Sequence, residues 1–153
     1  MYSKEEKKKL VRDFWNQFDE YSSQIPELMH KKKKWMLYNT KIAGVTFKFD
    51  VQRKYTAVIL ELSQRNEKRR LEMYEKLESY KAIIEEGFED GLIWDFAFVR
   101  ESGQEVCRVF TELEGPDFHR KSDWEAIFEF MATNMMRLEN SFLDIRDILQ
   151  QNK

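Results

Sequence analysis

One acidic residue, Glu61, stands out because apolar residues lie on both sides of it. The segment 54–63 (Lys-Tyr-Thr-Ala-Val-Ile-Leu-Glu-Leu-Ser) is typical of a central β-strand. A buried carboxylate costs free energy unless it is paired or takes part in chemistry. Glu61 is therefore the first candidate for a general acid or base, because burial can shift the pKa of an acid into a useful range. The alternative, which we favour, is a structural carboxylate paired with Lys41, with another basic side chain or with a backbone donor.

Two charged residues on later strands, Asp95 and Arg108, could lie beside Glu61. Arg108 has apolar neighbours on its own strand face, so it either extends its charged end at a sheet edge or pairs with an acid. Glu61, Asp95, Arg108 and Lys41 together form the candidate polar cluster of this chain. In a groove, such a cluster would bind a small ligand or a peptide. The commoner arrangement of the same residues is a buried ion network.

The elements around Glu61 follow the order helix, three strands, helix and strand, which resembles the core of the PD-(D/E)XK nucleases. In that resemblance, acids on two strands bind Mg²⁺, and a lysine two residues after the second acid orients the attacking water. Here Ser63 stands where that lysine is needed. A four-residue loop over 51–54 predicts that Gly44 faces Glu61 and that Asp50 lies roughly 20 Å from Glu61 along the strands. We therefore predict no catalytic residue, no metal ligand and no cofactor.

A second candidate site is the basic run of Lys31, Lys32, Lys33 and Lys34, which Trp35 follows. Lysines beside an aromatic ring can bind phosphate and stack a nucleic-acid base. Residues 1–70 carry 17 Lys and Arg against 9 Asp and Glu, whereas residues 71–153 carry 9 against 19. The net charge of the whole chain is −2, and nucleic-acid binders are usually basic overall. We therefore favour a solvated loop for the lysines, and nucleic acid is the less favoured partner.

Other residue types limit the chemistry and the compartment. One cysteine, Cys107, and two histidines, His30 and His119, supply no zinc ligand set. A lone cysteine suits a reducing cytoplasm. No apolar run approaches the roughly 20 residues that cross a bilayer, and the charged segment 1–9 lacks the apolar stretch of a signal peptide. We therefore expect a cytoplasmic protein that does not enter a membrane.

The candidate residues must be positioned by a single domain, 1–153, because this length matches the usual size of one domain. Apolar periodicity and turn signals predict the order α-β-β-β-α-β-β-α. The first helix starts at a capping box formed by Ser3 and Glu6 and ends before Pro26. The later elements are predicted at about 35–38, 45–50, 55–63, 66–88, 93–99, 105–112 and from 122 onward. The fold class is α+β, with a mixed, mostly antiparallel sheet of about five strands and a long C-terminal helix.

Two of these elements carry specific packing expectations. The strand 93–99 is apolar at every position except Asp95, which predicts that both of its faces are covered. The link from strand 55–63 to strand 93–99 through helix 66–88 should form a right-handed crossover. In that helix we expect the apolar stripe to face the core and Arg70 to point outward.

The C-terminal helix has apolar residues at alternating steps of four and three, which is an a/d heptad pattern. These positions are Trp124, Phe128, Met131, Met135, Leu138, Phe142, Ile145 and Leu149. About 27 residues at 1.5 Å each make a helix about 40 Å long. The pattern could support self-association through this helix. We favour packing across the first helix and the sheet, because an apolar sheet needs a helical cover.

A family resemblance lies in the runs 39–50 and 57–63 and in the pairs Ile93-Trp94, Arg108-Val109 and Asp123-Trp124. These runs resemble a bacterial domain-of-unknown-function family of small, stand-alone α+β proteins, over nearly the whole chain. Related domains occur C-terminal to restriction-endonuclease-like modules, which implies an accessory role near DNA by analogy. Our first hypothesis is a non-enzymatic cytoplasmic accessory or interaction domain with a protein partner. The alternative is a degenerate or divergent restriction-endonuclease-like protein that acts on nucleic acid.

Overall fold

The computed structural model describes residues 3–25 and 40–150, and its centre is one antiparallel sheet. The strands are β1 (Val45–Gln52), β2 (Tyr55–Leu62), β3 (Ile93–Val99) and β4 (Glu105–Glu114), in the order β1-β2-β4-β3. The α+β class and the long C-terminal helix are therefore confirmed. The described part of the sheet has four strands rather than about five, and all its neighbouring pairs are antiparallel. The strand expected at 35–38 lies outside the described residues.

Five helical segments accompany the sheet in the described part of the chain. They are α1 (Lys4–Ser23), α3 (Glu67–Glu78), α4 (Lys81–Ile84), the short 3-10 helix η2 (Lys121–Asp123) and α5 (Trp124–Gln150). The capping box is confirmed, because the Ser3 hydroxyl accepts from the Glu6 amide and the Glu6 carboxylate accepts from the Ser3 amide. The single helix expected over 66–88 is instead divided at Ser79 and Tyr80 into α3 and α4.

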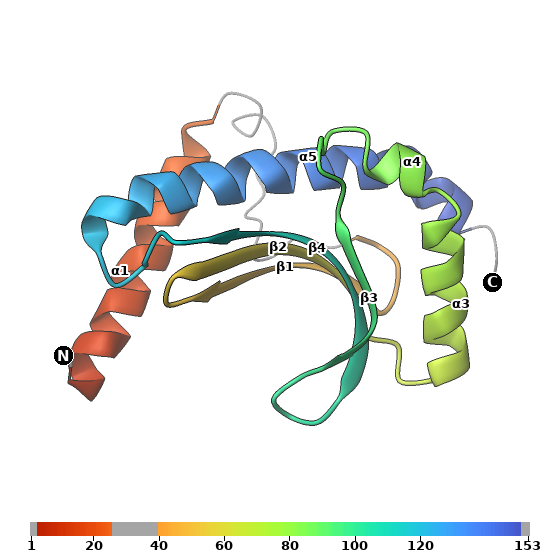
Figure 1. Cartoon of the computed structure of the whole chain (residues 1–153), viewed down its shortest axis with the longest axis horizontal. Coiled ribbons are helices and arrows are strands. Elements are labelled where there is room, and N and C mark those ends of the chain that lie inside the picture. The colour runs from red at the N-terminus through yellow and green to blue at the C-terminus, as the bar shows by residue number, and fades with distance from the viewer. Residues whose placement is uncertain (1–2, 26–39, 151–153) are drawn as a thin grey trace.

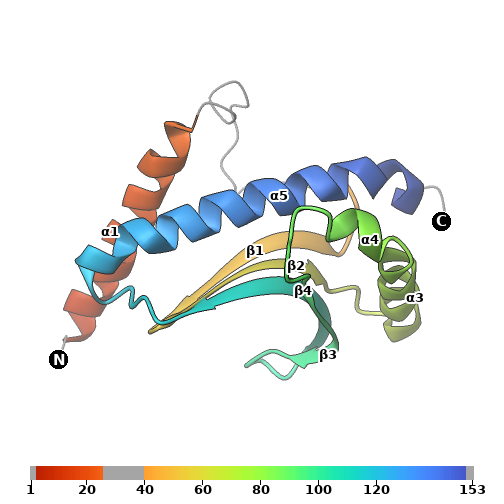
Figure 2. The same ribbon diagram turned by 45° about the horizontal axis from the view of Figure 1, so that its top comes forward.

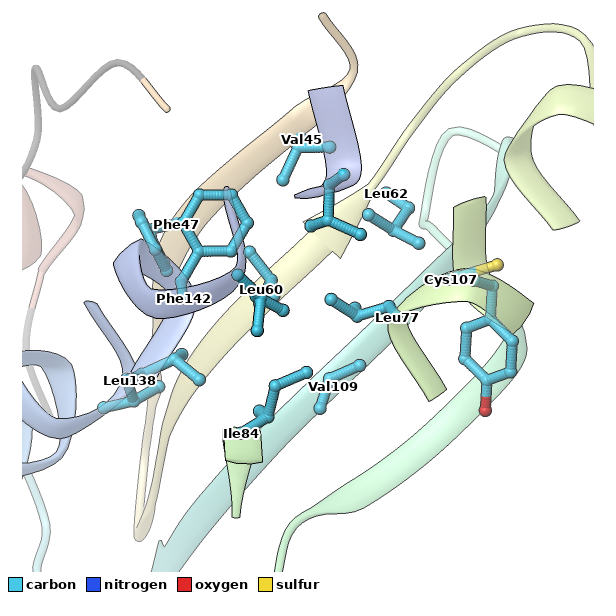
Figure 3. Close-up of a cluster of buried hydrophobic side chains, with 14 of the residues drawn as sticks. Val45, Phe47, Leu60, Leu62, Leu77, Ile84, Cys107, Val109, Leu138 and Phe142 are labelled. Atoms are coloured by element: carbon cyan, nitrogen blue, oxygen red, sulfur yellow. The ribbon is translucent and has the colours of Figure 1, made fainter. Parts of the chain in front are cut away.

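Helix α5 lies along one face of the curved sheet, and α1 crosses α5 near the N-terminal end of α5 (Figures 1 and 2). All eight heptad positions of α5 are buried. The C-terminal half packs with α3, α4 and the sheet, in the cluster that contains Leu60, Leu77, Val109 and Phe142 (Figure 3). The predicted packing across the first helix and the sheet is thus confirmed.

The N-terminal half of α5 forms a second apolar cluster with α1. The Phe14 ring makes an edge contact with Trp124 at 5.4 Å between centroids, and Phe18 packs on Phe128 at 5.5 Å. Phe49 of β1 and Phe130 of α5 adjoin both clusters. The two clusters therefore form a continuous core along α5.

The predicted register of the first hairpin is wrong by two residues. A two-residue turn, Arg53-Lys54, joins β1 to β2, and Thr46 rather than Gly44 lies opposite Glu61. Lys54, the second residue of this turn, adopts a left-handed conformation with φ of 61°. Since the shift is an even number of residues, every side chain remains on the face expected for it.

The prediction that strand 93–99 is covered on both faces is also wrong. Among the described strands, β4 lies between β2 and β3, so β3 forms one edge of the described sheet. Ile93, Phe96 and Val99 are 42%, 59% and 59% exposed. The ladder is also irregular, because Asp95 pairs with Arg108 and Phe98 pairs with Val106, which places two residues of β3 opposite one of β4.

Candidate functional site

Glu61 lies at the centre of the sheet on the face that points away from α5. Its strand neighbours Leu60 and Leu62 belong to the core beneath α5, so strand alternation turns Glu61 to the opposite face. We call this face the uncovered face, because none of the described helices lies on it (Figures 1 and 2). Glu61 is nevertheless 0% exposed. Long side chains from the neighbouring strands must therefore shield it.

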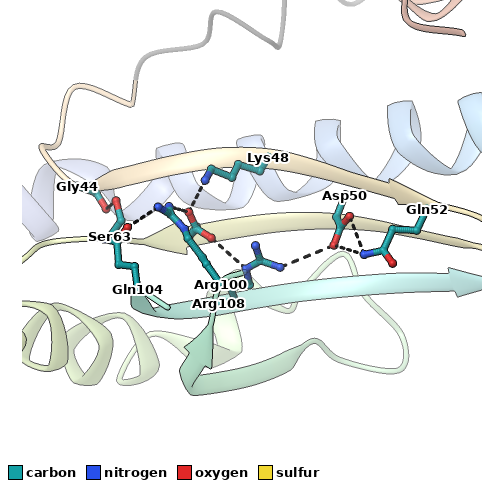
Figure 4. A network of polar contacts seen from close by, with 9 residues as sticks. Gly44, Lys48, Asp50, Gln52, Ser63, Arg100, Gln104 and Arg108 are labelled. Carbon is teal, nitrogen blue, oxygen red and sulfur yellow. Dashed lines mark hydrogen bonds and ion pairs between the residues drawn. The ribbon is translucent and has the colours of Figure 1, made fainter. Parts of the chain in front are cut away.

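Three cations shield Glu61 and occupy both of its carboxylate oxygens. Arg108 Nε of β4 donates to Oε1 at 3.0 Å, and Lys48 Nζ of β1 lies 2.5 Å from Oε2. The Nη2 group of Arg100, just beyond the end of β3, also donates to Oε2. Figure 4 shows the three side chains converging from β1, from β4 and from the residue after β3. The contact therefore ties together all four strands of the described sheet.

The network extends from Glu61 in two directions. Arg108 Nη1 lies 3.9 Å from Asp50 Oδ2, and its guanidinium lies 3.8 Å from the centre of the Phe98 ring. In the other direction, Arg100 Nη1 donates to Gln104 Oε1 at 2.7 Å (Figure 4). We call Lys48, Asp50, Glu61, Arg100, Gln104 and Arg108 the Glu61 network.

The charges around Glu61 determine its protonation state. Burial acts to raise its pKa, but hydrogen bonds and ion pairs with Arg100, Lys48 and Arg108 outweigh burial and lower the pKa below the usual value. Glu61 is therefore ionised at neutral pH. A general acid needs a raised pKa, so this environment favours a structural ion network over acid–base chemistry.

The structure brings together only part of the predicted polar cluster. Glu61 and Arg108 form an ion pair. Asp95 lies opposite Arg108 in the β3–β4 ladder, and its Oδ1 accepts from the Ala97 amide at the irregular step. Lys41 lies before β1, where its carbonyl oxygen accepts from the Gln150 side chain at 3.1 Å. The cations that surround Glu61 are instead Lys48, Arg100 and Arg108.

Lys48 and Arg100 were missed for different reasons. The wrong register placed Lys48 two residues farther along β1 from Glu61, whereas the observed register makes it a diagonal neighbour. Had a two-residue turn at Arg53-Lys54 been assumed, Lys48 would have been predicted to lie beside Glu61. The position of Arg100 depends on the irregular step in β3, for which the sequence carries no clear signal. The other candidate site, Lys31 to Lys34 with Trp35, lies outside the described residues.

The described ranges, 3–25 and 40–150, contain no group of three or more His, Cys, Asp or Glu side chains close enough to hold a metal ion. At Glu61, a divalent ion would also meet three cations. Across these ranges, no helix is both long and apolar enough to cross a bilayer.

Fold and site together define a small α+β domain with an antiparallel sheet and an ion network on its uncovered face. The profile of a protein family described as "Domain of unknown function (DUF4268)" matches residues 10–146, and the chain belongs to this family. The expectation of a domain-of-unknown-function family is thereby confirmed. Neither the curated proteins nor the solved structures contain a match to the chain.

Proposed function

We propose that this chain is a non-enzymatic, cytoplasmic accessory domain that binds a protein partner at the edge of β3. The observation that carries the proposal is the exposure of Ile93, Phe96 and Val99, which we call the edge surface. An edge strand presents backbone groups to which another strand can be added, and soluble proteins usually protect such edges with charge. Here large apolar side chains lie beside that edge. A partner segment with an extended backbone and apolar side chains fits this surface.

The Glu61 network supports the proposal because it orders the strand that carries the edge surface. Arg100 follows β3 directly and is bound to both Glu61 and Gln104. Arg108 lies over the Phe98 ring. These contacts hold the end of β3 against the sheet, and a binding edge that is ordered beforehand loses less entropy when a partner binds.

The charges of the uncovered face favour protein over nucleic acid as the partner. Lys48, Arg100 and Arg108 share the two carboxylates of Glu61 and Asp50, so most of their charge is compensated within the chain. A nuclease-like role would require acids that share a metal ion, and here Asp50 and Glu61 are joined through Arg108. By resemblance, one possible partner class is a restriction-endonuclease-like protein, and bacterial origin is part of the same proposal.

The test compares a double variant of the edge surface with a matched control. Phe96→Ser with Val99→Ser removes two exposed apolar side chains from β3, and Val11→Ser removes one that is 42% exposed on α1. A partner captured from the native host by the immobilised wild-type chain is identified, purified and titrated against all three proteins. We expect the double variant to bind at least about tenfold more weakly, because central apolar contacts dominate interface energies. The control should bind like the wild type.

Hydrogen exchange then locates the contact. The purified partner should slow amide exchange in β3 of the wild-type chain. Equal affinity of the double variant, or protection confined to other elements, would refute the proposal. Turnover of a substrate by the chain alone would refute its non-enzymatic part.

A further inference from the structure

A pocket of about 460 Å³ lies beside the start of α3, outside the edge surface. Its lining residues are Arg65, Glu67, Arg70, Gln104 and Glu105. We propose that this pocket binds a small molecule through an oxyanion, either a carboxylate or a phosphate, with Arg70 as the principal contact. The proposal does not depend on the protein partner proposed above.

Arg70 carries the argument because it is a buried arginine, only 4% exposed, whose donors are incompletely satisfied. Its Nη1 donates to the Gln64 carbonyl at 3.0 Å. Its Nη2 lies 3.7 Å from Glu105 Oε1, which is longer than a hydrogen bond. Its Nε is itself buried and, among the described residues, has no hydrogen-bond acceptor. Nε and Nη2 form one edge of the guanidinium, and two parallel N–H bonds from such an edge match the two oxygens of an oxyanion.

The incompletely satisfied donors of Arg70 also give a ligand a source of binding free energy. Buried donors without acceptors destabilise a fold, so an oxyanion that accepted both bonds would stabilise the protein as it bound. The neighbouring Cys107 thiol does not neutralise Arg70. Burial raises the pKa of Cys107, although the charge of Arg70 and a side-chain hydrogen bond with Arg70 both act to lower it, so the thiol stays protonated and is a neutral contact of the guanidinium.

The rest of the pocket provides further groups for an anion. The first turn of α3 follows the N-cap Asn66, whose side chain accepts from the Arg69 amide at 3.1 Å, and a helix N-terminus favours negative charge. Because Gln104 Oε1 already accepts from Arg100, the Gln104 amide has its N–H donors left to offer. Gln104 also connects the pocket to the Glu61 network.

Glu105 makes the proposal sharply testable. Its side chain is 47% exposed, and it is the carboxylate that loosely faces Arg70 Nη2. An incoming oxyanion must displace it, so Glu105 competes with the ligand. Removing the charge of Glu105 should therefore strengthen binding, whereas removing the fork of Arg70 should weaken it.

The experiment titrates the full chain with acetate and, separately, with inorganic phosphate at constant ionic strength set by chloride. Binding is followed by the ¹⁵N–¹H resonance of Arg70 Nε and by the side-chain amide of Gln104. We expect saturable shifts at both positions. Arg70→Lys keeps the charge but lacks the fork, and it should weaken binding about tenfold. Glu105→Gln should tighten it several-fold. The exposed Glu72→Gln, on α3 but not in the pocket, changes the net charge equally and should leave binding unchanged.

Each result of these titrations either supports or overturns the oxyanion site. Acetate or phosphate binding that depends on Arg70 or Glu105 supports the site, and the tighter of the two shows which oxyanion it prefers. If Arg70→Lys does not fold, Glu105→Gln against Glu72→Gln remains the decisive pair. Absence of saturable shifts at Arg70 and Gln104, or equal effects of the two glutamate changes, would overturn the proposal.

Discussion

At the scale of single residues, Glu61 shows how a sheet can bury a carboxylate without a helix above it. Three cations from β1, from β4 and from the end of β3 enclose it. Removing one member of a buried ion network is costly because the remaining charges stay desolvated and unpaired. Glu61 is thus a stabilising centre whose loss should affect the whole sheet.

Replacement of Glu61 by glutamine should destabilise the fold by about 3–5 kcal/mol, because Lys48, Arg100 and Arg108 would then face one another without a counter-charge. Urea unfolding followed by far-ultraviolet circular dichroism measures this change. The matched control is Asp50→Asn, which removes an acid of the same network that is 28% exposed and 3.9 Å from Arg108. Its cost should stay below about 1 kcal/mol. Equal costs for the two variants would contradict the central role of Glu61.

The unfolding free energies of the wild type and Glu61→Gln, compared at several pH values, distinguish a loss of charge interactions from a loss of packing. The folded-state pKa of Glu61 lies below the ordinary value of 4.5, so its ion pairs contribute their full stability above that pH. The contribution decreases as the pH falls below 4.5 and through the folded-state pKa. Wild-type stability should therefore approach that of Glu61→Gln in acid, and a constant difference from pH 7 to pH 3 would argue against an ionic cause.

At the scale of elements, the first hairpin depends on the backbone conformation of Lys54. Its φ of 61° allows a two-residue turn, which sets the register and brings Lys48 within reach of Glu61. A left-handed conformation costs a residue with a side chain about 1–2 kcal/mol. The hairpin therefore retains strain at one exposed position.

Lys54→Gly should relieve that strain and stabilise the protein by up to about 1 kcal/mol, after allowance for the greater freedom of glycine in the unfolded chain. The control is Gln52→Gly, two residues earlier in the extended strand β1, where glycine should destabilise by roughly 0.5–1 kcal/mol. Thermal unfolding of both variants measures the difference. Destabilisation by both changes would show that the turn conformation carries no strain.

The strand β3 illustrates a second limit at this scale. Its composition resembles that of a strand covered on both faces, yet β3 is an edge strand. An apolar strand sequence predicts that the strand is buried. It does not distinguish burial inside the chain from burial by a partner, because both select apolar residues. This ambiguity motivates the proposal that a partner covers the edge surface.

At the scale of the whole molecule, α5 joins two apolar clusters that share Phe49 and Phe130. One cluster contains the sheet, α3 and α4, and the other contains α1. Elements that share core residues lose stability together. The chain should therefore behave as the single domain expected from its length.

Equilibrium unfolding in urea should show one transition with the same midpoint for probes of both clusters. Trp124 fluorescence reports on the α1 cluster, in a variant in which the other three tryptophans are replaced by phenylalanine. Labelling of the Cys107 thiol, which is 0% exposed, reports on the sheet cluster. An earlier transition at Trp124 would mean that α1 separates from the sheet independently.

Features that depend on residues close together in the chain could be predicted from the sequence. The capping box at Ser3, the apolar stripe of α5 and the alternation of faces around Glu61 all follow from helix and strand geometry over short distances. The family resemblance and the α+β class follow from the same local patterns. The Glu61–Arg108 pairing joins strands distant in sequence, and the sequence offered it only as one of several candidate charge pairs.

The hairpin register, the position of β3 at the edge of the described sheet and the burial of Arg70 could be read only from the folded chain; the sequence pattern predicts that Arg70 points outward. These features depend on one unusual φ angle, on the order of strands and on a pocket formed by segments distant in sequence. Each is set by the lowest free energy of the whole packed chain, and local propensity contributes little to that choice. The partners of Glu61 therefore became known only when all four strands were in place.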